Sequence, residues 1–120
     1  MTIFLVLAGL MGAAGIMLAA AGAHAAPGAG LDGAAYMLLF HAAAIIGGSA
    51  LVQQAALWRP LALAVLAAWV VGAGLFSGDI ALRALAGHRL FPMAAPSGGI
   101  ILIVGWLGFA VAASGALLRG

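Results

Sequence analysis

The stretch PLALAVLAAWVVGAGLFSGDIALRALA, residues 60–86, carries two charged side chains, Asp79 and Arg83, in an otherwise apolar run. Because a helix needs about 20 apolar residues to cross a bilayer, this stretch predicts a transmembrane helix. Pro60 suits the first helical turn, where its missing N–H loses no hydrogen bond. Gly87 suits the position just after the last turn. We therefore expect a fold built on membrane-spanning helices.

The composition extends this prediction to the whole chain. Hydrophobic residues make up 68% of the 120 residues and charged residues 5%, whereas soluble domains carry roughly a quarter charged residues. The sequence thus predicts a single transmembrane domain over residues 1–120, in a multi-pass protein of the cell (cytoplasmic) membrane that is surrounded by lipid bilayer. The lack of Cys excludes disulfides and thiolate metal sites, and the four scattered Arg form no patch for nucleic acid.

Four segments have the length of a spanning helix: about residues 2–24, 33–57, 60–86 and 98–118. They predict an all-α integral membrane protein, an antiparallel up-down bundle of four transmembrane helices. Asp32, directly before the second segment, is predicted to be its N-cap. The AHA at residues 23–25 resembles a signal-peptidase site, but the first segment is long for a signal and begins without Lys or Arg. We therefore expect it to be a retained helix.

The number of spans also bears on orientation, because an even number puts both termini on one side. Arg59 and Arg119 lie on that side, and Arg83 and Arg89 lie on the other. If Asp79 neutralises Arg83, the positive-inside rule favours cytoplasmic termini.

Small residues recur at three- and four-residue steps along the first and last segments, so that each set falls on one helix face. The first set is Ala8, Gly12, Gly15, Ala19 and Gly22; the second is Gly98, Gly105, Gly108, Ala112 and Gly115. Small faces let helix backbones approach each other closely. They predict packing inside the bundle or, alternatively, contact with a second copy or a partner membrane protein.

The polar residues gather in the half of the bundle near residues 25–32 and 87–96. Asp79 and Arg83 have the i, i+4 spacing of an intrahelical ion pair. At 1.5 Å per residue from the expected helix ends, His41 lies roughly 12 Å deep and Asp79 roughly 10 Å deep. His41, Asp79 and Arg83 therefore form a candidate polar cluster within the membrane. Two alternatives stay open: the ion pair is purely structural, or the helix breaks at Gly78 and the acid lies at the interface.

No metal, cofactor or catalytic residue is predicted. His24, His41 and Asp79 are the residue types of a 2-His-1-carboxylate site, but His24 is expected roughly 10 Å above the other two. The serines have no base at a suitable spacing, and neither a nucleophile elbow nor a phosphate loop occurs. The sequence therefore predicts a protein that is not an enzyme.

Several stretches together resemble one known family: AGAHA (residues 21–25), FHAAAIIGG (40–48), LFSGDIALRALAGHRLFPMAAP (75–96) and PSGGIILIVGW (96–106). The chain is similar to the bacterial four-helix membrane family named domain of unknown function four-two-three, related to the transmembrane protein two-five-six group. The resemblance implies four transmembrane helices in the cytoplasmic membrane and supplies no activity. The family pattern often has an uncharged residue where this chain has Asp79. The matching positions are Gly22, His24, His41, Phe76, Ser77, Gly78, Pro96, Gly98, Gly99 and Trp106.

Two functions fit these observations. A structural or accessory protein that interacts through its helices would use each polar residue as a cap, an anchor or an ion-pair member. A membrane binding or transport module would use His41, Asp79 and Arg83 as a half-membrane site for a proton, an ion or an amphiphile. The predicted equal depth of His41 and Asp79 is the observation that favours the second function.

Overall fold

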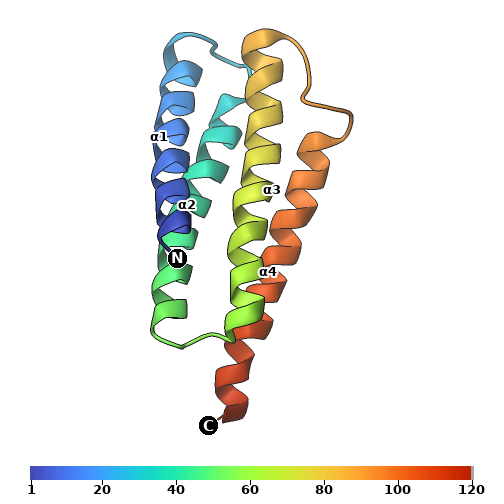
Figure 1. Ribbon diagram of the computed structural model, residues 1–120. Helices are drawn as coiled ribbons and strands as arrows, with labels where there is room; N and C mark the ends of the chain where they lie inside the picture. Colours follow the sequence, from blue (N-terminus) through green and yellow to red (C-terminus); the bar gives the residue numbers. More distant parts are fainter. Residues whose placement is uncertain (120) are drawn as a thin grey trace.

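Four α-helices make up the part of the chain that the computed structural model describes, residues 1–119 (Figure 1). They are α1 (Thr2–His24), α2 (Leu31–Gln53), α3 (Arg59–Ala86) and α4 (Ala94–Arg119), and no strand occurs in this range. Each contains a stretch that is long and apolar enough to cross a membrane. The predicted all-helical fold with four candidate spans is confirmed.

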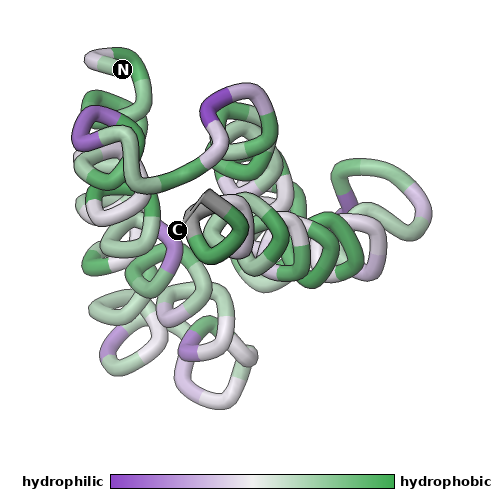
Figure 2. Tube along the Cα trace, turned by 90° about the horizontal axis from the view of Figure 1, so that it is seen from below, coloured by the Kyte–Doolittle hydropathy of each residue, from purple (hydrophilic) through white to green (hydrophobic). Residues whose placement is uncertain are grey.

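The helices pack side by side in chain order. α1 contacts α2, α2 contacts α3 and α3 contacts α4, whereas α1 has few contacts with α3. The α1–α2 and α3–α4 connections lie at one end of the molecule, here called the loop end, and the α2–α3 connection lies at the other (Figure 1). Hydrophilic residues occupy only short stretches of the trace (Figure 2). Large apolar side chains are exposed on every helix, among them Ile3, Leu10, Phe40, Val71, Ile100 and Leu107.

α3 is continuous over its 28 residues. It begins after Trp58, whose backbone is extended, and has Pro60 in its first turn. Gly87 ends the helix with φ +81°, in the left-handed region that glycine adopts without steric cost. A break at Gly78 is therefore wrong, and Asp79 lies inside the helix.

α2 begins two residues before the predicted start, at Leu31. Its N-cap is Gly30, with φ +81°, and no side chain caps the helix. The prediction that Asp32 is the N-cap is wrong, because the left-handed glycine lets the helix begin before the acid. Asp32 instead lies in the first turn, where the helix dipole still favours a carboxylate.

Two other helix ends differ from the prediction. α2 ends at Gln53 rather than residue 57, because the chain turns away at Ala55 with φ +57°. Residues 54–58 therefore connect α2 to α3. α4 begins at Ala94 rather than residue 98, and Pro96 lies in its first turn, where a proline breaks no helical hydrogen bond.

Glycines bring α3 and α4 into backbone contact. A Cβ atom at Gly98 would lie 2.6 Å from the Gly72 carbonyl oxygen and 2.6 Å from the Phe76 backbone nitrogen. One at Gly105 would lie 2.9 Å from the Trp69 ring. The small-residue face of α4 therefore packs inside the bundle, as the first interpretation of that face predicted.

The small-residue face of α1 is divided. Gly15 and Gly22 face α2, and a Cβ at Gly22 would lie 3.2 Å from Asp32 Oδ1. A Cβ at Gly12 would have no heavy atom within 4 Å, and the same holds for Gly9, which lies next to this face. Part of this face thus serves the α1–α2 contact, and part of it faces outward.

Candidate binding site at the loop end of α3 and α4

Asp79 is a buried carboxylate whose two oxygens have different partners. Oδ2 lies 3.4 Å from an Arg83 guanidinium nitrogen one helical turn later, so the predicted intrahelical ion pair is confirmed. Oδ1 accepts a hydrogen bond of 3.0 Å from the Leu90 backbone N–H. The Asp79 residue is only 2% exposed, whereas the Arg83 side chain is 43% exposed. A carboxylate in apolar surroundings needs such partners, because an unpaired buried charge is costly.

The bond to Leu90 ties the connection between α3 and α4 back onto α3. This connection, residues 87–93, contains exposed His88, Arg89, Leu90 and Phe91. At its far end Met93 has φ +68°, an uncommon value for a residue other than glycine. Asp79 therefore does two things: it pairs with Arg83, and it holds the connection at Leu90 against α3.

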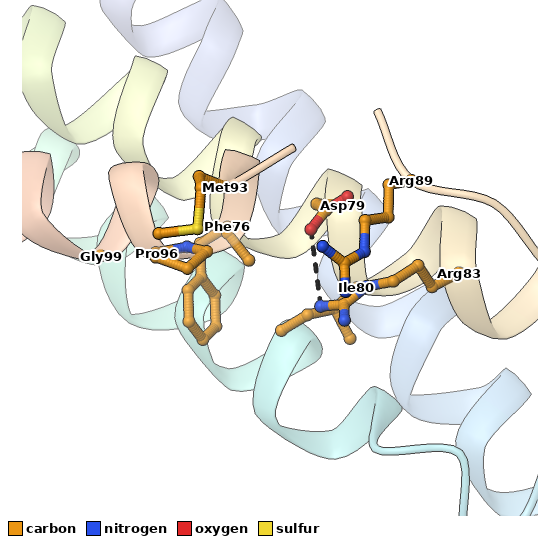
Figure 3. A pocket seen from close by; sticks show the side chains of 9 residues that line it. Phe76, Asp79, Ile80, Arg83, Arg89, Met93, Pro96 and Gly99 are labelled. Carbon is orange, nitrogen blue, oxygen red and sulfur yellow. Dashed lines mark ion pairs between the residues drawn. The ribbon is translucent and has the colours of Figure 1, made fainter. Parts of the chain in front are cut away.

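The polar cavity, as we call it, opens between α3, the connection and the start of α4, with a volume of about 480 Å³. Arg83 and Arg89 both line it together with Asp79 (Figure 3). Two guanidinium groups and one carboxylate leave an excess of one positive charge in its lining. Its apolar walls are Phe76, Ile80, Met93, Ala95, Pro96 and Gly99.

A second cavity, the apolar groove, continues from the polar cavity toward the middle of the helices. Its volume is about 280 Å³, and Phe76 and Gly99 line both spaces. The remaining lining residues are Met37, His41, Leu102, Ile103 and Trp106. The two cavities therefore share a border, with the charges at the loop end and the indole of Trp106 at the other.

His41 belongs to the apolar groove. Its Nε2 accepts a hydrogen bond of 3.1 Å from the Trp106 indole N–H, and its Nδ1 lies 2.8 Å from the Met37 carbonyl oxygen. Because an indole N–H can only donate and a carbonyl can only accept, this pattern requires a neutral imidazole with its proton on Nδ1. The ring centroids of Trp69 and Trp106 are 4.5 Å apart, and that of His41 is 6.3 Å from Trp69. His41 thus completes an aromatic cluster that joins α2, α3 and α4.

The predicted cluster of His41 with Asp79 and Arg83 is wrong. His41 lies level with Trp69, and Asp79 is ten residues further along α3, about 15 Å away at 1.5 Å per residue. The physical reason is the offset between α2 and α3. The Ser77 hydroxyl donates a 2.7 Å hydrogen bond to the Ala34 carbonyl, which places Ser77 beside the first turn of α2. Most of the part of α3 that follows Ser77 therefore extends past the start of α2. The equal depth predicted from the helix ends does not hold.

Some of the other positions that carried the resemblance line the two cavities, and others do not. His24 is exposed at the end of α1, and Gly78 has only the Leu90 side chain near the position of a Cβ. Within residues 1–119, no three His, Asp or Glu side chains lie close enough together to hold a metal ion. Phe76, Pro96 and Gly99 line the polar cavity, and His41 and Trp106 line the apolar groove.

The sequence analysis did not select Arg89 as a site residue, and it gave Trp106 only as a position that matches the family. Arg89 was visible as a cation near Asp79 in the chain, but only the path of the connection brings it to the cavity. Trp106 carries an N–H that needs a partner in apolar surroundings, and His41 is among the few acceptors at mid-helix. The need of the Trp106 N–H for an acceptor was therefore a signal from which its hydrogen bond to His41 could have been predicted.

Comparison with protein families matches residues 18–99, more than half of the chain, to the family described as Protein of unknown function (DUF423). Comparison with curated proteins and with solved structures gave no match. The match includes the end of α1, all of α2 and α3, and the start of α4 as far as Gly99, and therefore the polar cavity and part of the apolar groove. The expected resemblance to this family is thus confirmed, and the chain belongs to the DUF423 family.

Proposed function

We propose that the protein is a multi-pass protein of the cell membrane, an antiparallel bundle of four transmembrane helices, that binds an anionic headgroup in the polar cavity. The observation that carries this proposal is the pair of guanidinium groups, Arg83 and Arg89, in one cavity with a single carboxylate. The positive-inside rule supports cytoplasmic termini, which puts the polar cavity at the outer face of the membrane. The proposal includes no catalysis.

The chemistry of the two arginines favours an oxygen anion. A guanidinium presents several N–H donors in a planar fork, which matches the geometry of phosphate and carboxylate groups. Asp79 neutralises one of the two charges and holds Arg83 at the cavity wall. Arg89 makes no ion pair with the acids of residues 1–119, so its charge is available to a ligand.

The test uses purified protein and two lipids with the same acyl chains, anionic phosphatidylglycerol and zwitterionic phosphatidylcholine. Native mass spectrometry gives the ratio of their apparent affinities for the wild type and for Arg89→Gln. A hydrogen bond to a charged group contributes about 1.5–3 kcal/mol when shielded from water. Because Arg89 is exposed, we expect a smaller effect, a loss of phosphatidylglycerol affinity of about three- to tenfold.

Arg59→Gln is the matched control, because Arg59 is also an exposed arginine but lies at the opposite end of α3. It is expected to leave the affinity ratio unchanged. Equal binding of both lipids by the wild type would contradict the proposal. So would an equal loss of phosphatidylglycerol in the Arg59 and Arg89 variants.

Asp79 distinguishes anion binding from cation or proton binding. Asp79→Asn keeps an oxygen for the Leu90 N–H but removes the negative charge, so the affinity for phosphatidylglycerol should rise by a few-fold. Asp79→Ala also removes the acceptor, which frees the connection that positions Arg89, and the affinity should fall. A loss of binding in Asp79→Asn would indicate that the carboxylate itself is the binding group, and the anion proposal would be wrong.

A second candidate function is the structural or accessory one, through contact between helices of different chains. The outward-facing Gly9 and Gly12 of α1 favour it, since small residues allow close approach of another helix. Gly12→Leu should then weaken an oligomer or complex, measured by the mass of the particle in detergent. Gly47→Leu, at an equally open glycine of α2, is the control. An unchanged mass in both variants, equal to one chain in the wild type, would exclude self-association through α1.

A further inference from the structure

The apolar groove has walls from three helices and an end formed by a hydrogen bond. α2 contributes Met37 and His41, α3 contributes Phe76, and α4 contributes residues from Gly99 to Trp106. Within residues 1–119 the backbones of α2 and α4 do not come within 8 Å of each other, measured between Cα atoms. The Trp106–His41 hydrogen bond is a side-chain bridge between these two helices. The groove therefore begins at the polar cavity and ends at this bridge.

The apolar groove adjoins the polar cavity, which is the proposed headgroup site. Phe76 and Gly99 form the border between the two cavities, so a ligand can occupy both without crossing a closed wall. From Gly99 to Trp106 the groove runs seven residues of α4, about 10 Å at 1.5 Å per residue. Apart from the edges of His41 and Trp106, its lining offers no polar group.

We infer that the apolar groove holds a hydrocarbon chain of the same anionic lipid whose headgroup lies against Arg83 and Arg89, and that the chain extends to Trp106. This inference rests on the proposed function and deepens it, because it names a whole membrane lipid as the ligand rather than a free anion. The excess positive charge of the polar cavity favours an anionic headgroup. Because Phe76 and Gly99 form the border between the two cavities, the chain must enter the apolar groove beside Gly99. A lipid chain in the groove gains little hydrophobic free energy relative to a chain in bulk lipid. The groove therefore contributes to binding through its shape and through van der Waals contact with the chain.

The experiment measures whether the chain of an anionic lipid reaches Trp106. The protein is placed in phosphatidylcholine vesicles that contain a small fraction of lipid brominated near the middle of one chain, because bromine quenches tryptophan fluorescence on contact. The brominated lipid is either phosphatidylglycerol or phosphatidylcholine at the same mole fraction. Trp58→Phe is used as the background, which removes the exposed tryptophan at the opposite end of the molecule.

The expected result is at least twofold stronger quenching by brominated phosphatidylglycerol than by brominated phosphatidylcholine. The excess should disappear with Trp106→Phe, since Trp69 is 1% exposed and does not line the groove, and also with Arg89→Gln. It should persist with Arg59→Gln.

A second variant tests the path of the chain. A Cβ at Gly99 would lie 3.9 Å from Phe76, so Gly99→Ala fits, whereas Gly99→Leu fills the border between the cavities. Gly99→Leu should abolish the excess quenching and Gly99→Ala should keep most of it, with helix content checked by circular dichroism in both.

The outcomes separate this inference from the proposed function. Equal quenching by the two brominated lipids, together with preferential phosphatidylglycerol binding in the mass spectra, overturns the inference and leaves the headgroup proposal in place. Excess quenching that remains in Trp106→Phe also overturns it, because the chain then lies elsewhere. Absence of preference in both measurements contradicts both proposals.

Discussion

Gly98→Ala should separate α3 from α4, although it adds a single methyl group. The added Cβ would lie 2.6 Å from two backbone atoms, the Gly72 oxygen and the Phe76 nitrogen. Ordinary contacts of a Cβ begin near 3.4 Å, so the two backbones must move apart by 3.4 − 2.6 = 0.8 Å. Neither neighbouring atom is the end of a flexible side chain that could turn away.

This displacement would loosen contacts along the whole interface between the helices. Trp69 against Gly105 and Leu102 against Gly72 are packed at similarly short separations, near 2.9 Å from the position of a Cβ. Overpacking of a well-packed interior costs about 1–3 kcal/mol. We therefore expect Gly98→Ala to lower the free energy of unfolding by about that amount, a change of roughly five- to 150-fold in the equilibrium.

Gly99→Ala is the matched control on the adjacent residue. Its Cβ would be 3.9 Å from the nearest atom, an ordinary contact. Because alanine is about 1 kcal/mol more favourable than glycine within a helix, this variant should be as stable as the wild type or slightly more stable. Unfolding of the detergent-solubilised protein by sodium dodecyl sulfate, followed by circular dichroism, gives both values. Equal stability of the two alanine variants would refute the reasoning from backbone contact.

Two further predictions concern hydrogen bonds between helices. Ser77→Ala removes the bond to the Ala34 carbonyl and should destabilise the bundle by about 0.6–1.7 kcal/mol in the same unfolding assay. Ser114→Ala should have little effect, since that hydroxyl bonds to a carbonyl of its own helix, and equal losses in the two variants would count against the assignment. Trp106→Phe removes the donor to His41 and should shift the ¹⁵N resonance of His41 Nε2, measured by NMR with labelled histidine. An unchanged resonance would mean that this hydrogen bond is absent in solution.

Features that depend on neighbouring residues in one helix could be predicted from the sequence. The number of helices long and apolar enough to cross a membrane followed from the length of the apolar runs, and the Asp79–Arg83 pair followed from its i, i+4 spacing. The continuity of α3 through Gly78 belongs to the same class, because one glycine in a long apolar helix does not end it. These predictions needed no knowledge of how the helices are placed against each other.

Features that depend on the offset between helices could not be predicted in this way. The depth of His41 relative to Asp79 is set by the Ser77–Ala34 contact, and the helix ends counted along the chain do not contain that information. The N-cap of α2 depended on whether Gly30 adopts a left-handed conformation, which a glycine is free to do or not to do. The place of Arg89 depended on the Asp79–Leu90 bond that anchors the connection.

The uneven contacts among the helices have a consequence for how the chain is made. The α1–α2 and α3–α4 contacts are the most extensive in the bundle, and the α2–α3 contact is smaller. The α1–α2 pair can therefore form most of its contacts as a hairpin before α3 and α4 have been synthesised. The α3–α4 pair can then form its own contacts without help from the first pair. The gene can therefore be divided within the codons for residues 54–58, which connect the two pairs of helices. Two halves that are synthesised separately and divided within this connection should associate and restore the α2–α3 contact around Trp69.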